Sequence, residues 1–287
     1  LLITQVLYWR GVLRYVETTA TPYGFGTPMS GLLAVRDALA DEDDVLVISD
    51  GFEVRYDQEA AIWPVMLRGT ADCVRTLTGD GLAVFPARPF AALVAPNAPS
   101  DPVNNLYRQP DAQTFPLRPG EGMYTLNRFT QAPVWDGPVL TPIPPARFGG
   151  GAQLTGYHLG ADRLYLEWRL PGPVAADYHY FGHLLDVRGD KLAQADSILW
   201  PGRFWCAGDR VISWVSLPPH DGVTTLRVGL YTLAGDGGFV NESLLDDAGS
   251  PVAAWLDIGV VTSASTRLHE SGVYESQAGR DDSFEAL

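Results

Sequence analysis

The stretch from Asp177 to Asp196, DYHYFGHLLDVRGDKLAQAD, constrains the fold most, because it predicts two strands joined by a glycine turn. Side chains in a strand alternate between the two faces of a sheet, and the first arm carries large side chains on both faces. One face has Tyr178, Tyr180, Gly182 and Leu184, and the other has His179, Phe181, His183 and Leu185. We therefore expect a central strand that packs on a sheet on one face and is covered by loops or another domain on the other.

The segment that surrounds this stretch predicts seven or eight strands at regular spacing. Within one of them, Leu164, Leu166 and Trp168 alternate with polar neighbours, as in a strand with one buried face. Such a series is typical of an all-β sandwich, here expected to be jelly-roll-like and to cover residues 151–262.

The first half of the chain shows a different pattern. The run VLVISDG, Val45 to Gly51, is typical of a buried strand in a parallel sheet, and short apolar strands alternate with helices around it. We expect a small layered α/β domain over residues 17–130, packed separately from the sandwich. Prolines and glycines predict a linker over residues 131–150, and a polar, aperiodic tail follows over 263–287.

Residues 1–16 predict an amphipathic helix with an aromatic collar. One interpretation is an ordinary helix docked on the domain that follows it. The other is an interfacial helix at the exit of a membrane helix, because Trp9, Arg10 and Arg14 are residue types that gather at the bilayer surface. No stretch reaches the roughly 18–20 apolar residues of a membrane span.

Charge and cysteine content limit the possible partners. The 287-residue chain has a net charge of −14, and Lys191 is its sole lysine. Nucleic-acid binding needs clustered basic side chains, so we expect no nucleic-acid partner. Cys73 and Cys206 fall in different halves of the chain, and we expect two buried, unpaired thiols.

No motif predicts a catalytic centre, a metal site or a cofactor. Asp50 follows a predicted parallel strand, at the edge where such sheets bind ligands, although it also suits a turn. His179 and His183 share a strand face and could ligate a metal ion, but no third ligand is in view.

The aromatic content of the predicted sandwich suggests sugar stacking. The candidate rings are those of Tyr165, Tyr178, Tyr180, Trp200 and Trp205. Half of them are expected to fill the core between the sheets, and only an exposed row on one concave face would favour a ligand. Hydrolysis of a glycoside would need two facing carboxylates, and the available side chains suit turns better. Those carboxylates are Asp177, Asp186 and Asp196.

Four segments occur in an order that resembles a known family: DYHYFGHLLDVRGDKLAQAD, WPGRFWCAGDRV, SLPPHDG and LRVGLY. They resemble the C-terminal extracytoplasmic domain of bacterial polytopic glycosyltransferases, the dolichyl-phosphate-mannose mannosyltransferase-like proteins that use polyprenyl-phosphate sugars. The first half is similar to the part that joins the last membrane helix to that domain. In this family the catalytic acids lie between early membrane helices, so no catalytic residue carries over to this chain.

The resemblance implies a non-catalytic extracytoplasmic domain of a membrane glycosyltransferase, with the membrane domain of the same polypeptide as its partner. Such a domain would shield or dock the acceptor or the lipid-linked sugar. We expect the chain alone neither to transfer nor to hydrolyse sugar. The alternative is a secreted carbohydrate-binding module with a jelly-roll sandwich.

Overall fold

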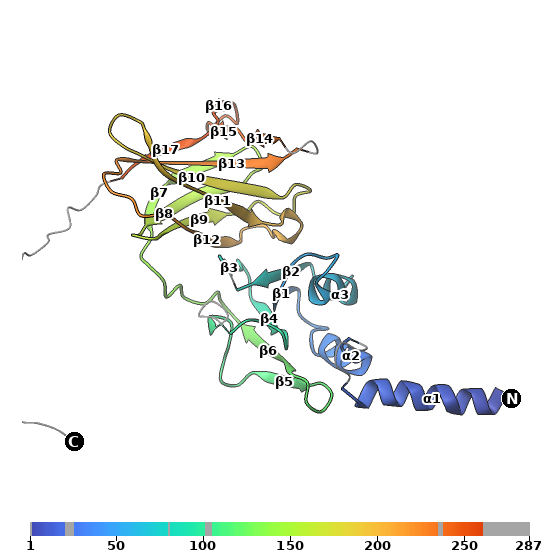
Figure 1. Ribbon diagram of the computed structural model, residues 1–287. Helices are drawn as coiled ribbons and strands as arrows, with labels where there is room; N and C mark the ends of the chain where they lie inside the picture. The colour runs from blue at the N-terminus through green and yellow to red at the C-terminus, as the bar shows by residue number, and fades with distance from the viewer. Residues whose placement is uncertain (1, 21–25, 80, 101–104, 235–237, 261–287) are drawn as a thin grey trace, which may run out of the picture.

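The structure is a computed structural model that describes residues 2–20, 26–79, 81–100, 105–234 and 238–260 (Figure 1). The described part is mostly β-strand, with three sheets and three helices. The tail expected over 263–287 lies outside the described residues. The helices are α1 (Leu2–Thr18), α2 (Met29–Ala38) and α3 (Gln58–Met66).

The first sheet has the strand order β2-β1-β4-β6-β5. Its strands are β1 (Asp44–Ser49), β2 (Cys73–Thr78), β4 (Phe90–Val94), β5 (Gln113–Pro116) and β6 (Met123–Phe129). β1 pairs in parallel with β2 and β4, whereas β6 runs antiparallel to β4 and β5. Helix α3 packs on β1 and β2, and α2 contacts β5.

Every residue of β1 is buried, because the two faces of the sheet enter two different cores. Val45 and Val47 pack against the helices, in a cluster that includes Trp63 of α3. Leu46 and Ile48 belong instead to a larger cluster that continues into the second half of the chain. The apolar run in the sequence is thus explained by burial on both faces, as expected for parallel strands.

The second half forms two antiparallel sheets, consistent with a β-sandwich. One has the order β11-β10-β13-β14, with β17 also paired to β13, and the other has the order β16-β15-β7-β8-β9-β12-β3. The first of these contains β10 (Tyr178–Leu185), β11 (Lys191–Trp200), β13 (Thr225–Leu233), β14 (Phe239–Asn241) and β17 (Leu256–Gly259). The second contains β3 (Leu82–Phe85), β7 (Thr141–Phe148), β8 (Gln153–Leu159), β9 (Arg163–Arg169), β12 (Arg210–Ser216), β15 (Leu244–Leu245) and β16 (Pro251–Ala253).

The two sheets approach closely at Gly182 of β10, where a Cβ atom would collide with Leu164 of β9. Leu164, Leu166 and Trp168 are fully buried in the sandwich core, as the alternation in the sequence predicts. The opposite face of β10, which carries His179, points away from that core.

The two halves of the chain are joined by strand pairing and by a side-chain hydrogen bond, in addition to the linker. Strand β3 comes from the first half but pairs antiparallel with β12, so it completes a sheet of the sandwich. Trp200 of β11 donates a hydrogen bond from its indole Nε1 to the carbonyl oxygen of Thr76 in β2, over 3.0 Å. The expectation of separately packed units is corrected on this point. Residues 141–148 of the expected linker also form a strand, β7, which is paired with β8 and β15.

A disulfide bond also joins the halves, between Cys73 and Cys206. The expectation of two unpaired thiols was wrong, because the sheet pairing brings β2 next to the turn Gly202–Phe204 that precedes Cys206. The sequence alone does not reveal that contact.

A buried ion network lies at the same junction. The guanidinium of Arg75 in β2 donates to both carboxylate oxygens of Asp209, over 2.6 and 2.8 Å, and it also pairs with Asp44. All three side chains are at most 1% exposed. Burial alone would lower the pKa of Arg75, but the hydrogen bonds with the two carboxylates outweigh it and raise that pKa, so the guanidinium stays charged.

Candidate functional site

Four of the five aromatic rings proposed for sugar stacking lie in the core. Tyr178 is 7% exposed, and Tyr180, Trp200 and Trp205 are at most 1% exposed. The tyrosines occupy the face of β10 that meets the opposing sheet, and the tryptophans pack where the sandwich meets the first sheet. The expected exposed row on a concave face therefore does not hold for these residues.

Tyr165 is the fifth ring, and it lies on the outer face of the other sheet. Its ring is 6.0 Å from that of Trp214 and 6.3 Å from that of Trp135, which comes from the segment before β7. All three residues are half-buried and pack against the large core. Tyr165 thus belongs to an aromatic cluster that is separate from the other four rings.

Asp50 is exposed at the carboxyl end of β1, where its Oδ1 accepts a hydrogen bond from the side-chain amide of Asn97 over 2.6 Å. A buried acid, Glu59 of α3, lies close enough for the two charges to interact. Its carboxylate accepts hydrogen bonds from Trp63 Nε1, over 2.6 Å, and from the Tyr124 hydroxyl, over 2.9 Å. Burial raises the pKa of Glu59 despite these two hydrogen bonds.

The three carboxylates considered for glycoside hydrolysis are apart from one another. Asp186 accepts hydrogen bonds from the backbone N–H groups of Arg188 and Asp190, and Asp177 accepts one from Gly202, so both act as turn residues. Asp196 lies on the outer face of β11. The structure brings no pair of them together.

That outer face carries a groove of about 360 Å³, which we call the aromatic groove. It is built on β10, β11 and β13, with contributions from β14 and from Trp255, which immediately precedes β17. Four aromatic rings line it, those of Phe181, Tyr231, Phe239 and Trp255. Its polar side chains are His183, Lys191, Gln194, Asp196, Arg227 and Asn241.

The strand register explains why these side chains meet. On β10, Phe181 and His183 point to the outer face, and their partners across the sheet are Asp196 and Gln194 of β11. On the other side, His183 is opposite Arg227 of β13. Because neighbours in register have Cβ atoms about 5 Å apart, the side chains form continuous rows across the three strands.

Gly229 provides the space for the floor of the groove. It lies opposite Phe181 in the pairing of β10 with β13, and a Cβ atom at this position would overlap the Phe181 ring. The ring therefore lies flat over the backbone of β13, stacked at 4.7 Å on the imidazole of His183. Any larger residue at 229 would displace this ring.

Trp255 and Phe239 form exposed walls, 38% and 73% accessible to solvent. The guanidinium of Arg227 lies 4.5 Å from the centre of the Trp255 ring and makes a two-point ion pair with Asp257, over 2.7 and 2.9 Å. Trp255 is thus held by a cation–π contact rather than by core packing.

Burial and neighbouring charges shift the pKa values of His183 and Tyr231 in the groove. Burial, and then the positive charge of Lys191, lower the pKa of His183, so its imidazole is neutral at pH 7. Burial and the negative charge of Asp196 raise the pKa of Tyr231. The His183 imidazole and the Tyr231 hydroxyl are therefore both uncharged at pH 7.

The sequence analysis named Tyr178 and Tyr180 as stacking candidates, and both lie on the buried face of β10, whereas the aromatic groove lies on its outer face. The alternation that placed His179, Phe181 and His183 together was the available signal, because Arg227, Gly229 and Tyr231 alternate in the same way on β13. What the pattern does not give is the register that brings the two sets together.

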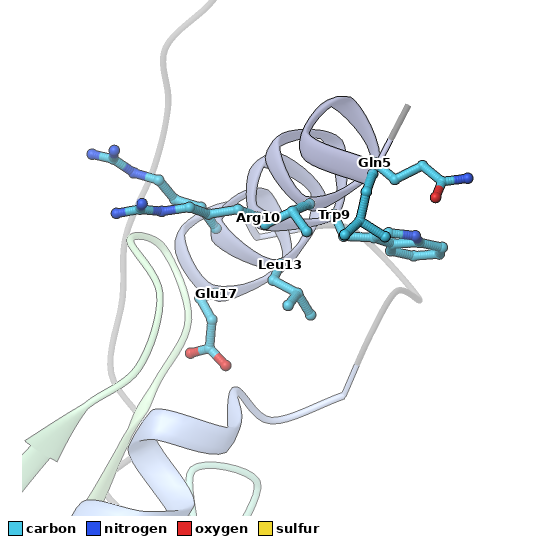
Figure 2. A pocket seen from close by; sticks show the side chains of 8 residues that line it. Gln5, Trp9, Arg10, Leu13 and Glu17 are labelled. Atoms are coloured by element: carbon cyan, nitrogen blue, oxygen red, sulfur yellow. The ribbon is translucent and has the colours of Figure 1, made fainter.

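Helix α1 is the second exposed apolar feature, and none of its residues is buried. Eight of its large apolar residues are 53–76% exposed: Leu2, Ile3, Val6, Leu7, Tyr8, Trp9, Leu13 and Tyr15. Figure 1 shows α1 projecting beyond the first sheet, and Figure 2 shows the side chains of Trp9 and Arg10 leaving the helix on different sides. Among the described residues, no helix has the length and apolar character needed to cross a membrane.

Metal ligands do not gather anywhere in the described ranges, where no group of three His, Cys, Asp or Glu side chains is arranged to hold an ion. His179 stacks on Tyr231 at 5.2 Å, next to the aromatic groove. The groove thus combines rings with side chains that can hydrogen-bond a polar ligand. No protein-family model matches the sequence, and comparison with curated proteins and with solved structures likewise gives no match.

Proposed function

We propose that this chain is a non-catalytic extracytoplasmic domain of a membrane glycosyltransferase, and that its aromatic groove holds a saccharide. The saccharide would be part of the acceptor or of the lipid-linked sugar, which the domain docks or shields near the membrane. The proposal includes the finer fold assignment, a small layered α/β domain followed by a jelly-roll sandwich. The aromatic groove is the observation that carries it.

The composition of the groove suits a sugar. A sugar ring has apolar C–H faces, which stack on flat aromatic rings, and a rim of hydroxyl groups, which need hydrogen-bond partners. Phe181 and Trp255 supply such rings, and Gln194, Asp196 and Asn241 supply planar amides and a carboxylate. A volume of about 360 Å³ is at the lower end of the usual range for ligand sites and suits one or two sugar units.

Two further features support an extracytoplasmic domain near a bilayer. The disulfide between Cys73 and Cys206 is typical of proteins in oxidising compartments. Helix α1 exposes Trp9 and several aliphatic side chains beside Arg10 and Arg14, a composition that favours the interface of a lipid bilayer.

Calorimetric titration of residues 1–287 with a panel of oligosaccharides tests saccharide binding. We expect at least one saccharide to bind, with its affinity reduced about tenfold or more by Trp255→Ala, because an aromatic wall is removed. Trp135→Ala is the matched control, since that ring lies in the cluster on the opposite sheet. Absence of binding across the panel would refute the role of the groove.

Activity assays test the non-catalytic role. Residues 1–287 alone should release no product from a polyprenyl-phosphate sugar or an aryl glycoside. The parent enzyme should lose activity when this region is deleted. Turnover by the isolated chain, or full activity after the deletion, would contradict the proposal.

A secreted carbohydrate-binding module is the second candidate, and the same groove favours it. The two differ in what α1 does, because a free module needs no bilayer. Flotation with lipid vesicles therefore discriminates between them.

A further inference from the structure

The charges of the aromatic groove differ from those of the protein as a whole. The chain has a net charge of −14, yet the groove is lined by two cations, Lys191 and Arg227, and one carboxylate, Asp196. A negatively charged ligand is favoured where one of these cations has no carboxylate paired with it.

Arg227 is already neutralised. Both of its hydrogen bonds to Asp257 are short, at 2.7 and 2.9 Å, and its guanidinium also stacks on Trp255. An exposed two-point pair of this kind satisfies both partners. Arg227 therefore orients the wall of the groove and leaves little charge for a ligand.

Lys191 is in a different state. Its ammonium donates a hydrogen bond to the side-chain oxygen of Gln194, which is a neutral acceptor. Across the part of the chain that the structure describes, no carboxylate lies within ion-pair distance of Lys191. Its charge thus has no counter-ion.

Asp196 does not provide that counter-ion, because it is on the same strand five residues further along. At about 3.3 Å per residue the Cα atoms of the two residues are about 16 Å apart, and the ammonium of Lys191 reaches Gln194 without forming an ion pair with Asp196. Asp196 is opposite Phe181, whereas Lys191 is opposite Leu185. The groove has a cationic end at Lys191 and an anionic end at Asp196, and the facing pair of Gln194 and His183 lies between them.

We infer that the aromatic groove binds an acidic saccharide in one orientation, with the carboxylate or phosphate of the sugar at Lys191 and its hydroxyl groups at Asp196 and Asn241. This inference rests on the proposed function and names the class of its ligand. The ammonium of Lys191 supplies the charge that an anion needs, and Gln194 and neutral His183 lie beside it to donate hydrogen bonds. Phe181, which is opposite Asp196, stacks against the sugar ring at the anionic end.

The test compares three ligands by calorimetry at low salt: a galacturonate oligosaccharide, the galactose oligosaccharide of the same linkage and length, and glucose 6-phosphate. We expect an acidic ligand to bind about tenfold or more tighter than the neutral oligosaccharide, as for a hydrogen bond to a charged group. Binding of the galacturonate oligosaccharide would identify a carboxylate as the preferred anion, and binding of glucose 6-phosphate would identify a phosphate. The preference should shrink as salt is added.

Variants assign the preference to Lys191. Lys191→Met removes the charge and keeps an unbranched side chain of similar length, so it should abolish the preference, whereas Lys191→Arg should retain it. Arg188→Met is the matched control, because Arg188 is an exposed cation in the adjacent turn, paired with Asp186 and Asp190. It should leave the preference unchanged.

The outcomes separate this inference from the proposed function. Equal affinity for acidic and neutral oligosaccharides would overturn the inference and leave saccharide binding in place. A preference that survives Lys191→Met would overturn it as well. Failure of all saccharides to bind would overturn the proposed function, and the inference with it.

Discussion

Replacing Asp209 with Asn tests whether the buried ion network holds the two halves together. Asp209 is fully buried and takes both hydrogen bonds from the Nε and Nη2 atoms of Arg75. Asn has the same size as Asp, but its side chain has one oxygen acceptor and one amino group that only donates. One N–H group of the Arg75 guanidinium would therefore lose its acceptor and lie against another donor. Removing one partner of a buried pair costs about 3–5 kcal/mol, and we expect the lower end because Asp44 still neutralises Arg75.

The pair of Arg227 with Asp257 supplies a control with the same geometry and little burial. It also forms two short hydrogen bonds, but its side chains are 28% and 44% exposed. Solvent-exposed pairs contribute about 0.2–1 kcal/mol, so Asp257→Asn should cost no more than about 1 kcal/mol. The contrast between the two variants isolates the effect of burial.

Urea unfolding followed by tryptophan fluorescence and far-UV circular dichroism measures both variants. Urea is chosen because it adds no ionic strength and does not screen the exposed pair. We expect the free energy of unfolding to fall by about 3 kcal/mol for Asp209→Asn. If the two variants differ by less than about 1 kcal/mol, the reasoning from burial is refuted.

Three further results are expected. Replacing both Cys73 and Cys206 with Ser should lower the free energy of unfolding by about 5 kcal/mol in the chain-entropy account, because the disulfide joins residues 133 positions apart. A fall of less than about 1 kcal/mol, measured by urea unfolding, would contradict this expectation. The pKa of Glu59 is raised in the folded state, so its contribution to stability is present below about pH 4.5 and is lost as the pH rises through the pKa of the folded state. The free energy of unfolding of the wild type relative to Glu59→Gln should therefore fall over that pH range. A difference that does not change with pH would contradict this expectation. In flotation with anionic vesicles, Leu13→Glu should abolish binding, whereas Thr4→Glu, on the opposite side of α1, should weaken it less. Equal binding of both variants would rule out insertion of the helix face that carries Leu2, Val6, Trp9 and Leu13.

Local patterns in the sequence predict the elements of this fold well. Alternation in the segment Arg163–Arg169 correctly places Leu164 and Trp168 in the core, and the apolar run around Val45 correctly predicts a buried strand. Each of these signals lies within a few residues of the position that it describes, because strand periodicity is a local property.

The sequence does not predict which strands pair with one another. Strand β3 reads as part of the first half, yet it pairs with β12, and its partner Ser213 is far along the chain from Leu82. The pairing of Cys73 with Cys206 and the alignment of Phe181 with Gly229 depend on the same kind of long-range contact. The aromatic groove exists only once the registers of β10, β11 and β13 are set, so local alternation does not predict it.

The spacing of the two cysteines has a consequence for how the chain is made. At about 5–20 residues per second, the ribosome adds the 133 positions between them in roughly 7–27 s. Throughout that interval Cys73 has emerged without its partner, and strand β3 likewise waits for β12. Residues 1–287 contain two cysteines, so a single bond is possible between cysteines of this segment. During synthesis Cys73 can be captured by any other thiol, and an exchange of disulfides with Cys206 would later reverse that capture.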